Sequence, residues 1–573
     1  MYSGKNSLQV VAKGALAALM VAGFMGAASP VSVAATTAKD KSAALLEALL
    51  PDAGEEKRAT ALHEIAQAKD KRFIAPLIDL LRFVNSRDEY VVLLQTLTGL
   101  VGEKIAGADN PWEALTVWYG AHEELQPPPG YTSWKGELHG QLIDPRFRQF
   151  LYKNAPHTVR VEEVVWGGVK VDGIPALVNP KLRAAKDADY LIDSEPVFGV
   201  SINGDQRAYP LRILDWHEMA NDVVGGKPVA LAYCTLCGSG VLYDTTVGDK
   251  TYVFGSSGFL FRSNKLMYDR ETNTLWNQLT GEPVIGKLVG SKIKLTVLPV
   301  VVTSWGEWKR QHPDTKVVDI NTGFDRPYQV GATYGRYFAS PDTMFPVWQQ
   351  SKVLPKKARI FAIQLGGRAK AYPLDLLNRA RGVVNDTLGT QPLVVVYRDA
   401  VGQIPLTKGW RTALRKLGGA DANITLANDL TLAAARAVLS AQPALLSDMS
   451  AEFLLAMPGE VRLTLLRERS TDQRVGADTA PDFFTPDLRN EVAQRGLIGE
   501  TRAFARGAHS FKPTASKDML LDERGRKWRV TEDALVADDG ERLSRLGGHL
   551  AYWFGWFSFY PKTEIYTLTH DAG

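Results

Sequence analysis

The chain has 573 residues, of which 45% are hydrophobic and 23% are charged, an ordinary composition for a folded protein. This length exceeds what one hydrophobic core supports, so we expect two to four domains. The formal net charge is only +4. The sequence has no long basic run, which argues against nucleic acid or an acidic polymer as the main partner.

The first 34 residues predict a signal peptide. Lys5 and Lys13 give a positive start before an apolar run at 14–28 that is too short to span a bilayer comfortably, and Ala34 ends an S-V-A cleavage pattern. An uncleaved anchor is the alternative. No later run is long and apolar enough to span a membrane. We therefore expect an exported protein, periplasmic or extracellular, that is not an integral membrane protein after cleavage.

Residues 42–124 carry apolar stripes at the spacing i, i+3, i+4, i+7. This pattern predicts a helical, HEAT-like domain at 36–126, because none of these short helices can bury its stripe alone. An irregular helical bundle is the alternative. The domain is also a candidate contact for an envelope protein. A P-P-P-G turn at 127–130 ends it, and 131–192 predicts a connecting segment of short strands and turns.

Two later segments, 193–320 and 357–568, resemble each other across a linker at 321–356. The pattern predicts an α+β fold with a tandem duplication of a β-rich unit. The second copy carries an insertion at 407–500, helical at first and loop-like at 470–486, which is either a lid, an added contact surface or a surface excursion. The matching pairs are Tyr209 with Tyr372, Asp222 with Asp386, Asp269 with Asp522, Trp308 with Trp556, and Thr315 with Thr563.

The candidate chemistry is confined to the first copy. The two cysteines of the chain, Cys234 and Cys237, form a C-T-L-C motif, and His217 lies shortly upstream. Arg398 stands opposite Cys234 in the second copy, and Leu520 stands opposite Met267. Residues shared by both copies serve the common fold, whereas residues present in one copy are candidates for function.

A metal site is the leading interpretation of this motif. Cys234 and Cys237 supply two thiolates from a tight turn, His217 an imidazole, and Met267 a thioether. Such a sulfur-rich set favours copper, especially Cu(I), with zinc as the other possibility. Glu218 and Asp222 are candidate residues behind the ligands, with Glu218 able to orient the imidazole or to replace Met267.

Two other interpretations stay open. The cysteines can cycle between dithiol and disulfide, with the nearby histidine tuning the thiolate. They can also form a structural disulfide or pack as small residues, since disulfides persist outside the cytoplasm. Gly238 follows the second cysteine where c-type haem attachment needs histidine. The Gly/Ser-rich run at 254–261 matches no phosphate loop and predicts a turn between strands, so we expect no nucleotide.

Four motifs in this region, W-H-E-M-A-N-D, Y-C-T-L-C-G-S-G, F-G-S-S-G and M-Y-D-R-E-T-N-T-L-W-N-Q-L-T-G-E, resemble a bacterial family known as domain-of-unknown-function 3179. The resemblance runs from about 131 to 566 and implies a secreted or periplasmic protein, but no reaction. We therefore expect an exported metal-binding protein, with a thiol-disulfide protein or a non-catalytic envelope binding module as alternatives. In that module the aromatic tail at 552–557 contacts a partner, or else it belongs to the core.

Overall fold

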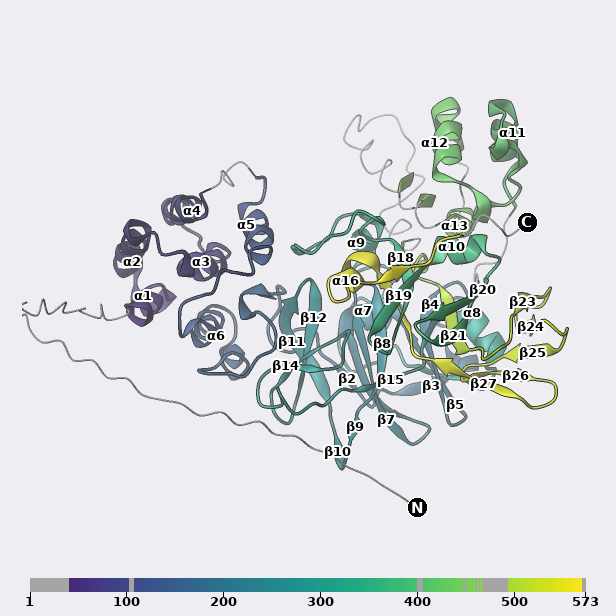
Figure 1. Ribbon diagram of the computed structural model, residues 1–573, viewed down its shortest axis with the longest axis horizontal. Helices are drawn as coiled ribbons and strands as arrows, with labels where there is room; N and C mark the ends of the chain where they lie inside the picture. The colour runs from purple at the N-terminus through teal and green to yellow at the C-terminus, as the bar shows by residue number, and fades with distance from the viewer. Residues whose placement is uncertain are drawn as a thin grey trace, which may run out of the picture. The chain divides into compact units, whose positions relative to one another are not determined.

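The computed structural model describes residues 41–102, 108–398, 405–446 and 493–568, together with 449, 451–458, 461–462 and 464–465. They form an α+β fold in which helices come first and antiparallel and mixed sheets follow (Figure 1). The expected signal peptide at 1–34 and the loop at 470–486 lie outside these residues. Among the helices that the structure describes, none has the length and apolar character needed to cross a bilayer.

The predicted helical block is helical, and its apolar stripes meet in one core. Leu62, Leu77 and Leu97 are buried there. Ser86 and Asn110 cap two of the helices by accepting a hydrogen bond from a backbone N–H of the first turn. The helices are α1 (Ser42–Ala48), α2 (Glu55–Ala68), α3 (Ile74–Leu81), α4 (Arg87–Val101) and α5 (Pro111–Gly120).

A sixth helix, α6 (Tyr131–Leu142), stands where we expected only strands and turns. Trp134 and Leu138 lie on its buried face. Glycine disfavours helix formation, and Gly136 lies in the middle of this one. A Cβ at Gly136 would lie 2.0 Å from the carbonyl oxygen of Leu151. Close packing against the following segment therefore stabilises this helix, although its local sequence disfavours one.

Three sheets carry the first β-rich segment. The first has the order β16 (Val301–Ser304), β4 (Pro196–Ile202), β5 (Asp205–Pro210), β17 (Lys316–Val318), β3 (Leu182–Ala184). The second has the order β15 (Thr296–Leu298), β8 (Ser239–Asp244), β7 (Lys227–Cys234), β6 (Met219–Val224), β2 (Leu177–Val178). The third has the order β1 (Val164–Trp166), β11 (Phe254–Phe261), β12 (Asn264–Asp269), β13 (Leu275–Asn277), β14 (Pro283–Ile285). Three short helices belong to this part, α7 (Leu211–His217), α8 (Trp305–Gln311) and α9 (Gly335–Ala339), as does the hairpin of β9 (Thr246–Val247) and β10 (Lys250–Thr251).

The Gly/Ser-rich run is strand β11 and not the turn that we expected. Its pairing with β12 shifts between Ser256 and Leu260, and Gly258 has φ +84°. Glycine and serine here allow an irregular strand to pass closely between two neighbours, as at a β-bulge.

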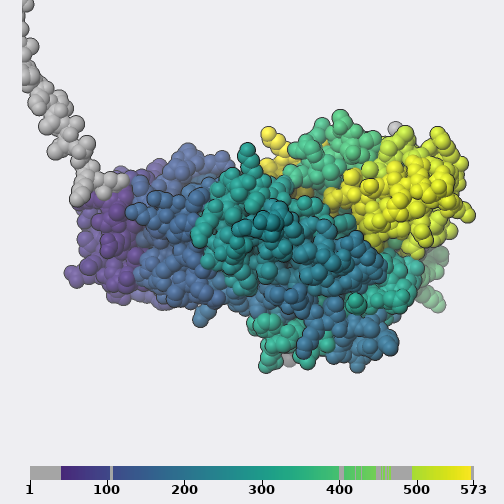
Figure 2. All heavy atoms as spheres, turned by 90° about the horizontal axis from the view of Figure 1, so that it is seen from below, coloured from purple at the N-terminus to yellow at the C-terminus, as the bar shows by residue number. Residues whose placement is uncertain are grey.

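The second β-rich segment forms two sheets. One has the order β28 (His549–Tyr552), β18 (Arg359–Leu365), β19 (Arg368–Pro373), β29 (Glu564–Ile565). The other has the order β20 (Val383–Leu388), β21 (Gln391–Arg398), β22 (Glu500–Ala505), β27 (Arg542–Leu546), β26 (Ala534–Ala537), β25 (Lys527–Val530), β24 (Met519–Leu521), β23 (Lys512–Pro513). Strands β23 to β27 contribute to the yellow surface in Figure 2. Two short helices, α10 (Leu374–Arg379) and α16 (Trp553–Phe557), accompany them.

The insertion is helical where the structure describes it. It contains α11 (Lys408–Leu417), α12 (Leu432–Ala441) and α13 (Ala451–Ala456). Trp410, Leu414 and Val438 form a hydrophobic cluster of its own. The aromatic tail lies mostly in the core, since Trp553, Phe554 and Trp556 of α16 are all buried. This placement favours the core interpretation of the tail over a partner surface.

Several side-chain contacts occur in both β-rich segments at matching positions. In each, an indole donates to a threonine, a tyrosine hydroxyl donates to an aspartate, and a second indole donates to another aspartate. The first segment has Trp308–Thr315 at 2.8 Å, Tyr209–Asp222 at 2.7 Å and Trp276–Asp269 at 2.9 Å. The second has Trp556–Thr563 at 2.8 Å, Tyr372–Asp386 at 2.9 Å and Trp528–Asp522 at 3.1 Å.

Candidate functional site

Both cysteines lie at the turn of the β7–β8 hairpin. Cys234 ends β7 and pairs with Ser239, which begins β8, so Cys237 belongs to the four-residue connection between them. Gly238 has φ +56°, a left-handed conformation that glycine adopts without strain. The two cysteines are free thiols, 1% and 0% exposed. The turn therefore brings two sulfurs together inside the protein.

The two thiols have unequal affinities for protons. Burial raises the pKa of Cys234, but hydrogen bonds from the Cys237 thiol and from the backbone N–H groups of Lys265 and Cys237 outweigh burial and lower it. Burial and donation to Cys234 raise the pKa of Cys237 well above its usual range. Cys234 is thus the sulfur whose thiolate is favoured, whereas the Cys237 thiol stays protonated and also donates to the Ser263 carbonyl oxygen at 3.5 Å.

Polar side chains from the neighbouring sheet fix the second cysteine. Asn264 of β12 donates to the Cys237 sulfur at 3.4 Å and to Gln278 Oε1 at 2.8 Å. Gln278 in turn donates to the carbonyl oxygens of Ala232 at 2.8 Å and Ser239 at 3.2 Å. These bonds couple the turn to two sheets, which orients the thiol.

A buried ion pair lies beside the turn. Lys265 Nζ lies 3.3 Å from Glu218 Oε2 and donates to the Glu218 carbonyl at 3.1 Å. The other carboxylate oxygen of Glu218 accepts from Thr235 at 2.9 Å and from Tyr334 at 3.2 Å. Thr235 lies between the two cysteines, so this carboxylate holds the turn directly.

Residues beyond the first β-rich segment also pack on the turn. Tyr337 donates to the Leu236 carbonyl at 2.6 Å, and the backbone N–H of Tyr552 donates to the Cys237 carbonyl at 2.7 Å. A Cβ at Gly555 would lie 3.1 Å from the Cys237 sulfur. The second segment therefore forms part of the wall that buries the sulfurs.

His217 uses both of its ring nitrogens away from the cysteines. Its Nδ1 lies 2.7 Å from the Pro175 carbonyl oxygen, and its Nε2 lies 2.6 Å from the Tyr328 hydroxyl. Burial is the main reason why its pKa falls to about 4. As the structure places it, the imidazole is a neutral, hydrogen-bonded core group.

The buried histidine makes stability depend on pH. Its folded pKa of about 4 lies below the unfolded value of about 6.5, so the stabilisation is present above pH 6.5 and is lost as pH falls toward 4. Each such histidine changes the free energy of unfolding by about 1.4 kcal/mol per pH unit in that window. Between pH 6.5 and pH 5, we expect the free energy of unfolding of His217→Gln to fall by about 2 kcal/mol less than that of the parent, measured by urea unfolding. Equal losses in the two proteins would contradict this assignment.

The other predicted site residues are divided between the turn and the core. Met267 belongs to a hydrophobic cluster with Met219 and Trp276, whereas both cysteines belong to another cluster. Asp222 accepts from Tyr209 at 2.7 Å and pairs with Arg207 at 2.7 Å. Of the predicted set, the structure thus brings together the two cysteines and Glu218.

Sequence reasoning missed Lys265, Asn264 and Gln278. The comparison of the two copies contained a signal for Lys265, because Asp518 stands opposite it, two residues before Leu520. Asp518 pairs with Arg398, the residue opposite Cys234, at 2.9 Å. The two matched positions therefore meet in both β-rich segments, as a thiol and an N–H in the first and as an ion pair in the second.

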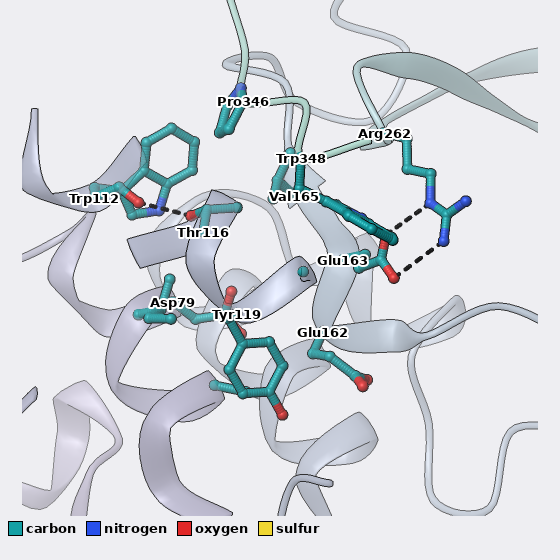
Figure 3. A pocket seen from close by; sticks show the side chains of 13 residues that line it. Asp79, Trp112, Thr116, Tyr119, Glu162, Glu163, Val165, Arg262, Pro346 and Trp348 are labelled. Carbon is teal, nitrogen blue, oxygen red and sulfur yellow. Dashed lines mark hydrogen bonds and ion pairs between the residues drawn. The ribbon is translucent and has the colours of Figure 1, made fainter. Parts of the chain in front are cut away.

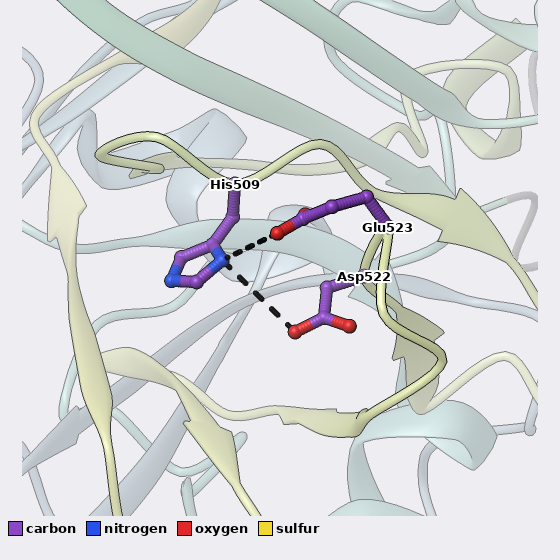
Figure 4. A group of neighbouring side chains, drawn as sticks. All are labelled: His509, Asp522 and Glu523. Carbon is purple, nitrogen blue, oxygen red and sulfur yellow. Dashed lines mark hydrogen bonds and ion pairs between the residues drawn. The ribbon is translucent and has the colours of Figure 1, made fainter.

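A separate cluster contains His509, Asp522 and Glu523 (Figure 4). In the described part of the chain, these are the three His, Cys, Asp or Glu side chains whose ligand atoms converge as a metal would need. Arg526 already pairs with Asp522 at 2.8 Å, and Trp528 donates to the same carboxylate. The Asp522 carboxylate is therefore already occupied by these donors, and we assign no metal to the cluster.

A small cavity lies where helix α5 meets β1 and the segment around Trp348 (Figure 3). Its volume is about 20 Å³, enough for about one water molecule. Glu163 pairs with Arg262 at 2.7 Å and accepts from the Trp348 indole at 2.7 Å. The cavity joins the helical block to the sheets and is too small for a substrate.

The model of one family, described as a protein of unknown function (DUF3179), matches residues 171–563. The chain belongs to this family. The match contains the cysteine turn, Lys265, Glu218 and most of both β-rich segments, and it ends before β29. No curated protein and no solved structure matches the chain. Chemistry at the turn must therefore be argued from this DUF3179 protein's own residues.

Proposed function

We propose that this DUF3179 protein is a thiol-disulfide redox protein whose reactive pair is Cys234 and Cys237. The observation that carries the proposal is the four-residue turn that buries two free thiols, with the Cys234 pKa lowered and the Cys237 pKa raised. A nucleophilic thiolate next to a protonated resolving thiol is the arrangement that disulfide exchange requires. Export, which residues 1–34 predict, would bring the pair to disulfide-containing partners.

The proposed reaction transfers two electrons to a partner disulfide. The Cys234 thiolate attacks one partner sulfur, the partner S–S bond breaks, and the released sulfur takes a proton. Cys237 then loses its proton and attacks Cys234, which breaks the mixed disulfide and releases the second partner thiol. After the reaction, this protein contains a Cys234–Cys237 disulfide and the partner contains two thiols. Exchange needs the wall formed by Tyr337 and Tyr552 to move, since both sulfurs are buried.

Trapping tests the proposal. We expect Cys237→Ser to form a stable mixed disulfide with oxidised glutathione, because Cys234 can attack but nothing resolves the product. Cys234→Ser should form at least tenfold less mixed disulfide, since its remaining thiol, Cys237, has a raised pKa. Mass spectrometry measures both adducts, and thiol titration with and without reductant measures the pair in the parent. A pair that never oxidises, or equal trapping by both variants, would rule out the redox role.

A metal site on the same sulfurs is the second candidate, with Cu(I) favoured and zinc possible. Two neighbouring buried sulfurs support it, because soft thiolate ligands select Cu(I). The ligand set predicted from the sequence also includes His217 and Met267. His217 would have to give up its hydrogen bond to Tyr328 in order to bind a metal. Elemental analysis after copper or zinc supplementation tests the candidate. About one equivalent of metal per chain that is lost in the double variant Cys234→Ser, Cys237→Ser would support the metal site. A stoichiometry near zero in the parent would exclude it.

We also propose that the two β-rich segments arose by tandem duplication. The matched indole–threonine, tyrosine–aspartate and indole–aspartate contacts support this proposal, as does the repeated helix after β16 and after β28. Contacts that recur at equivalent positions hold the shared scaffold. The cysteine turn occurs in the first segment, which is why we place the function there.

A further inference from the structure

A cavity of about 740 Å³ lies at the second β-rich segment, next to the core cluster that contains the cysteine turn. Strand β18, helix α10, helix α12 of the insertion and the loop after α9 all line it, and Figure 1 labels these elements. Its size falls within the range of small-molecule sites in proteins. The insertion therefore does more than extend the surface, since it completes one wall of a cavity.

Positive charge dominates the cavity wall. Two carboxylates, Asp342 and Asp375, also line it, so cations exceed carboxylates by six to two. Such an excess around a concave, partly desolvated space attracts anions. The cationic residues are Lys356, Lys357, Arg359, Arg379, Arg436 and Arg462.

Backbone carbonyls orient several of these cations without neutralising them. Arg359 donates to the carbonyls of Gly496 at 2.6 Å and Ile498 at 3.0 Å. Lys357 donates to the carbonyls of Tyr337 at 2.5 Å and Ser340 at 2.9 Å. A carbonyl carries no net charge, so Arg359 keeps its attraction for an anion. Burial lowers the pKa of Lys357 to about 7, so this side chain is charged only in part at neutral pH, and a bound anion would favour its protonated form.

Two more cations extend from the rim. Lys356 and Arg379 are exposed, and within the described ranges neither side chain forms an ion pair. They are the cations that a ligand can reach with the least rearrangement. Their positions on the loop before β18 and on α10 place them on two different walls.

The rest of the wall is apolar. Phe338, Leu376, Leu432 and Leu497 line the cavity, and Tyr552 does so too. Tyr552 also lies against the cysteine turn, because a Cβ at Gly238 would be 2.9 Å from its ring. A ligand that fits these walls needs an apolar body as well as an anionic group.

We propose that this cavity binds a small organic anion, in which a carboxylate, phosphate or sulfonate group faces the lysines and arginines and an apolar body packs on the leucines. Tyr552 is shared between this cavity and the wall of the cysteine turn, but anion binding does not require the proposed redox chemistry. Its counterpart positions in the first β-rich segment lack the insertion, so the insertion gives the second segment a binding role.

Binding of 1-anilinonaphthalene-8-sulfonate, which has both an apolar body and one negative group, tests the proposal on the full mature chain. We expect saturable fluorescence enhancement that inorganic phosphate reduces by competition. Lys356→Glu, Arg379→Glu should weaken binding at least tenfold, because two attractive charges become repulsive at the rim. The matched control is Lys527→Glu, Arg529→Glu on exposed positions of β25, which makes the same charge change outside the cavity.

The outcomes separate a specific anion site from general dye adsorption. A loss in the cavity variant with no loss in the control supports the proposal. Leu376→Gln leaves the charge unchanged. It should weaken binding of the dye, but phosphate should still compete with the dye that binds. Equal affinity in the cavity variant and the parent would overturn the proposal, as would equal weakening in the control.

Discussion

Replacing Lys265 by methionine is expected to lower the free energy of unfolding by about 3–5 kcal/mol, because it leaves the buried Glu218 carboxylate without its cation. The two side chains are only 4% and 8% exposed, so water cannot compensate for the loss. Urea unfolding followed by circular dichroism measures the change. The same substitution should also loosen Thr235, which Glu218 holds, and raise the rate at which a small thiol reagent modifies the cysteines.

Two further variants make this result specific. Lys265→Met with Glu218→Gln removes both charges, and we expect it to recover a large part of the lost stability. Lys250→Met breaks an exposed pair with Glu271 and should leave the midpoint of urea unfolding almost unchanged. If Lys265→Met were no more harmful than Lys250→Met, the buried ion pair would not stabilise the turn.

Replacing Arg502 by methionine should be at least as damaging, at about 3–5 kcal/mol. Its guanidinium pairs with Glu500 at 2.5 Å and with Glu532, and the two glutamates have lowered pKa values, with the neighbouring arginines among the causes that offset burial. Arg398 and Arg545 remain in the variant, but each contacts only one of the two carboxylates. The variant therefore keeps one cation for each glutamate but loses the buried group that joins the two carboxylates.

The conservative and exposed variants bracket this effect. Arg502→Lys keeps the charge but cannot bridge two carboxylates with a planar group, so we expect an intermediate loss. Arg542→Met removes an exposed pair with Asp533 and should change stability by less than about 1 kcal/mol. Equal midpoints of urea unfolding for Arg502→Met and Arg542→Met would contradict a stabilising role for the network.

The sequence predicted much of the scaffold for local reasons. Apolar stripes at helical spacing predicted the helices between Ser42 and Gly120, and alternation around glycine turns predicted the strands from Pro196 to Cys234. It failed at α6, where glycines hid a helix, and at β11, where the same residue type suggested a turn. In both places a close approach of neighbouring backbone decided the conformation, and local propensity does not report such contacts.

The candidate site was predictable only in part. The C-x-x-C spacing placed both sulfurs on one turn, and the comparison of the two copies directed attention to it. Spacing could not show that His217 turns toward Pro175 and Tyr328, because those partners lie far away in the sequence. Nor could it show that Lys265 and Asn264, from another sheet, reach the turn.

What the sequence determined by itself is the order of helical block, two similar β-rich segments and insertion, together with the pair of sulfurs in one tight turn. These features depend on short-range periodicity and on spacing along the chain. The tertiary structure alone decided which groups surround the sulfurs, why one thiol ionises before the other, and that the insertion completes a cationic cavity. Those outcomes depend on burial and on contacts between distant segments, and both exist only once the sheets have packed.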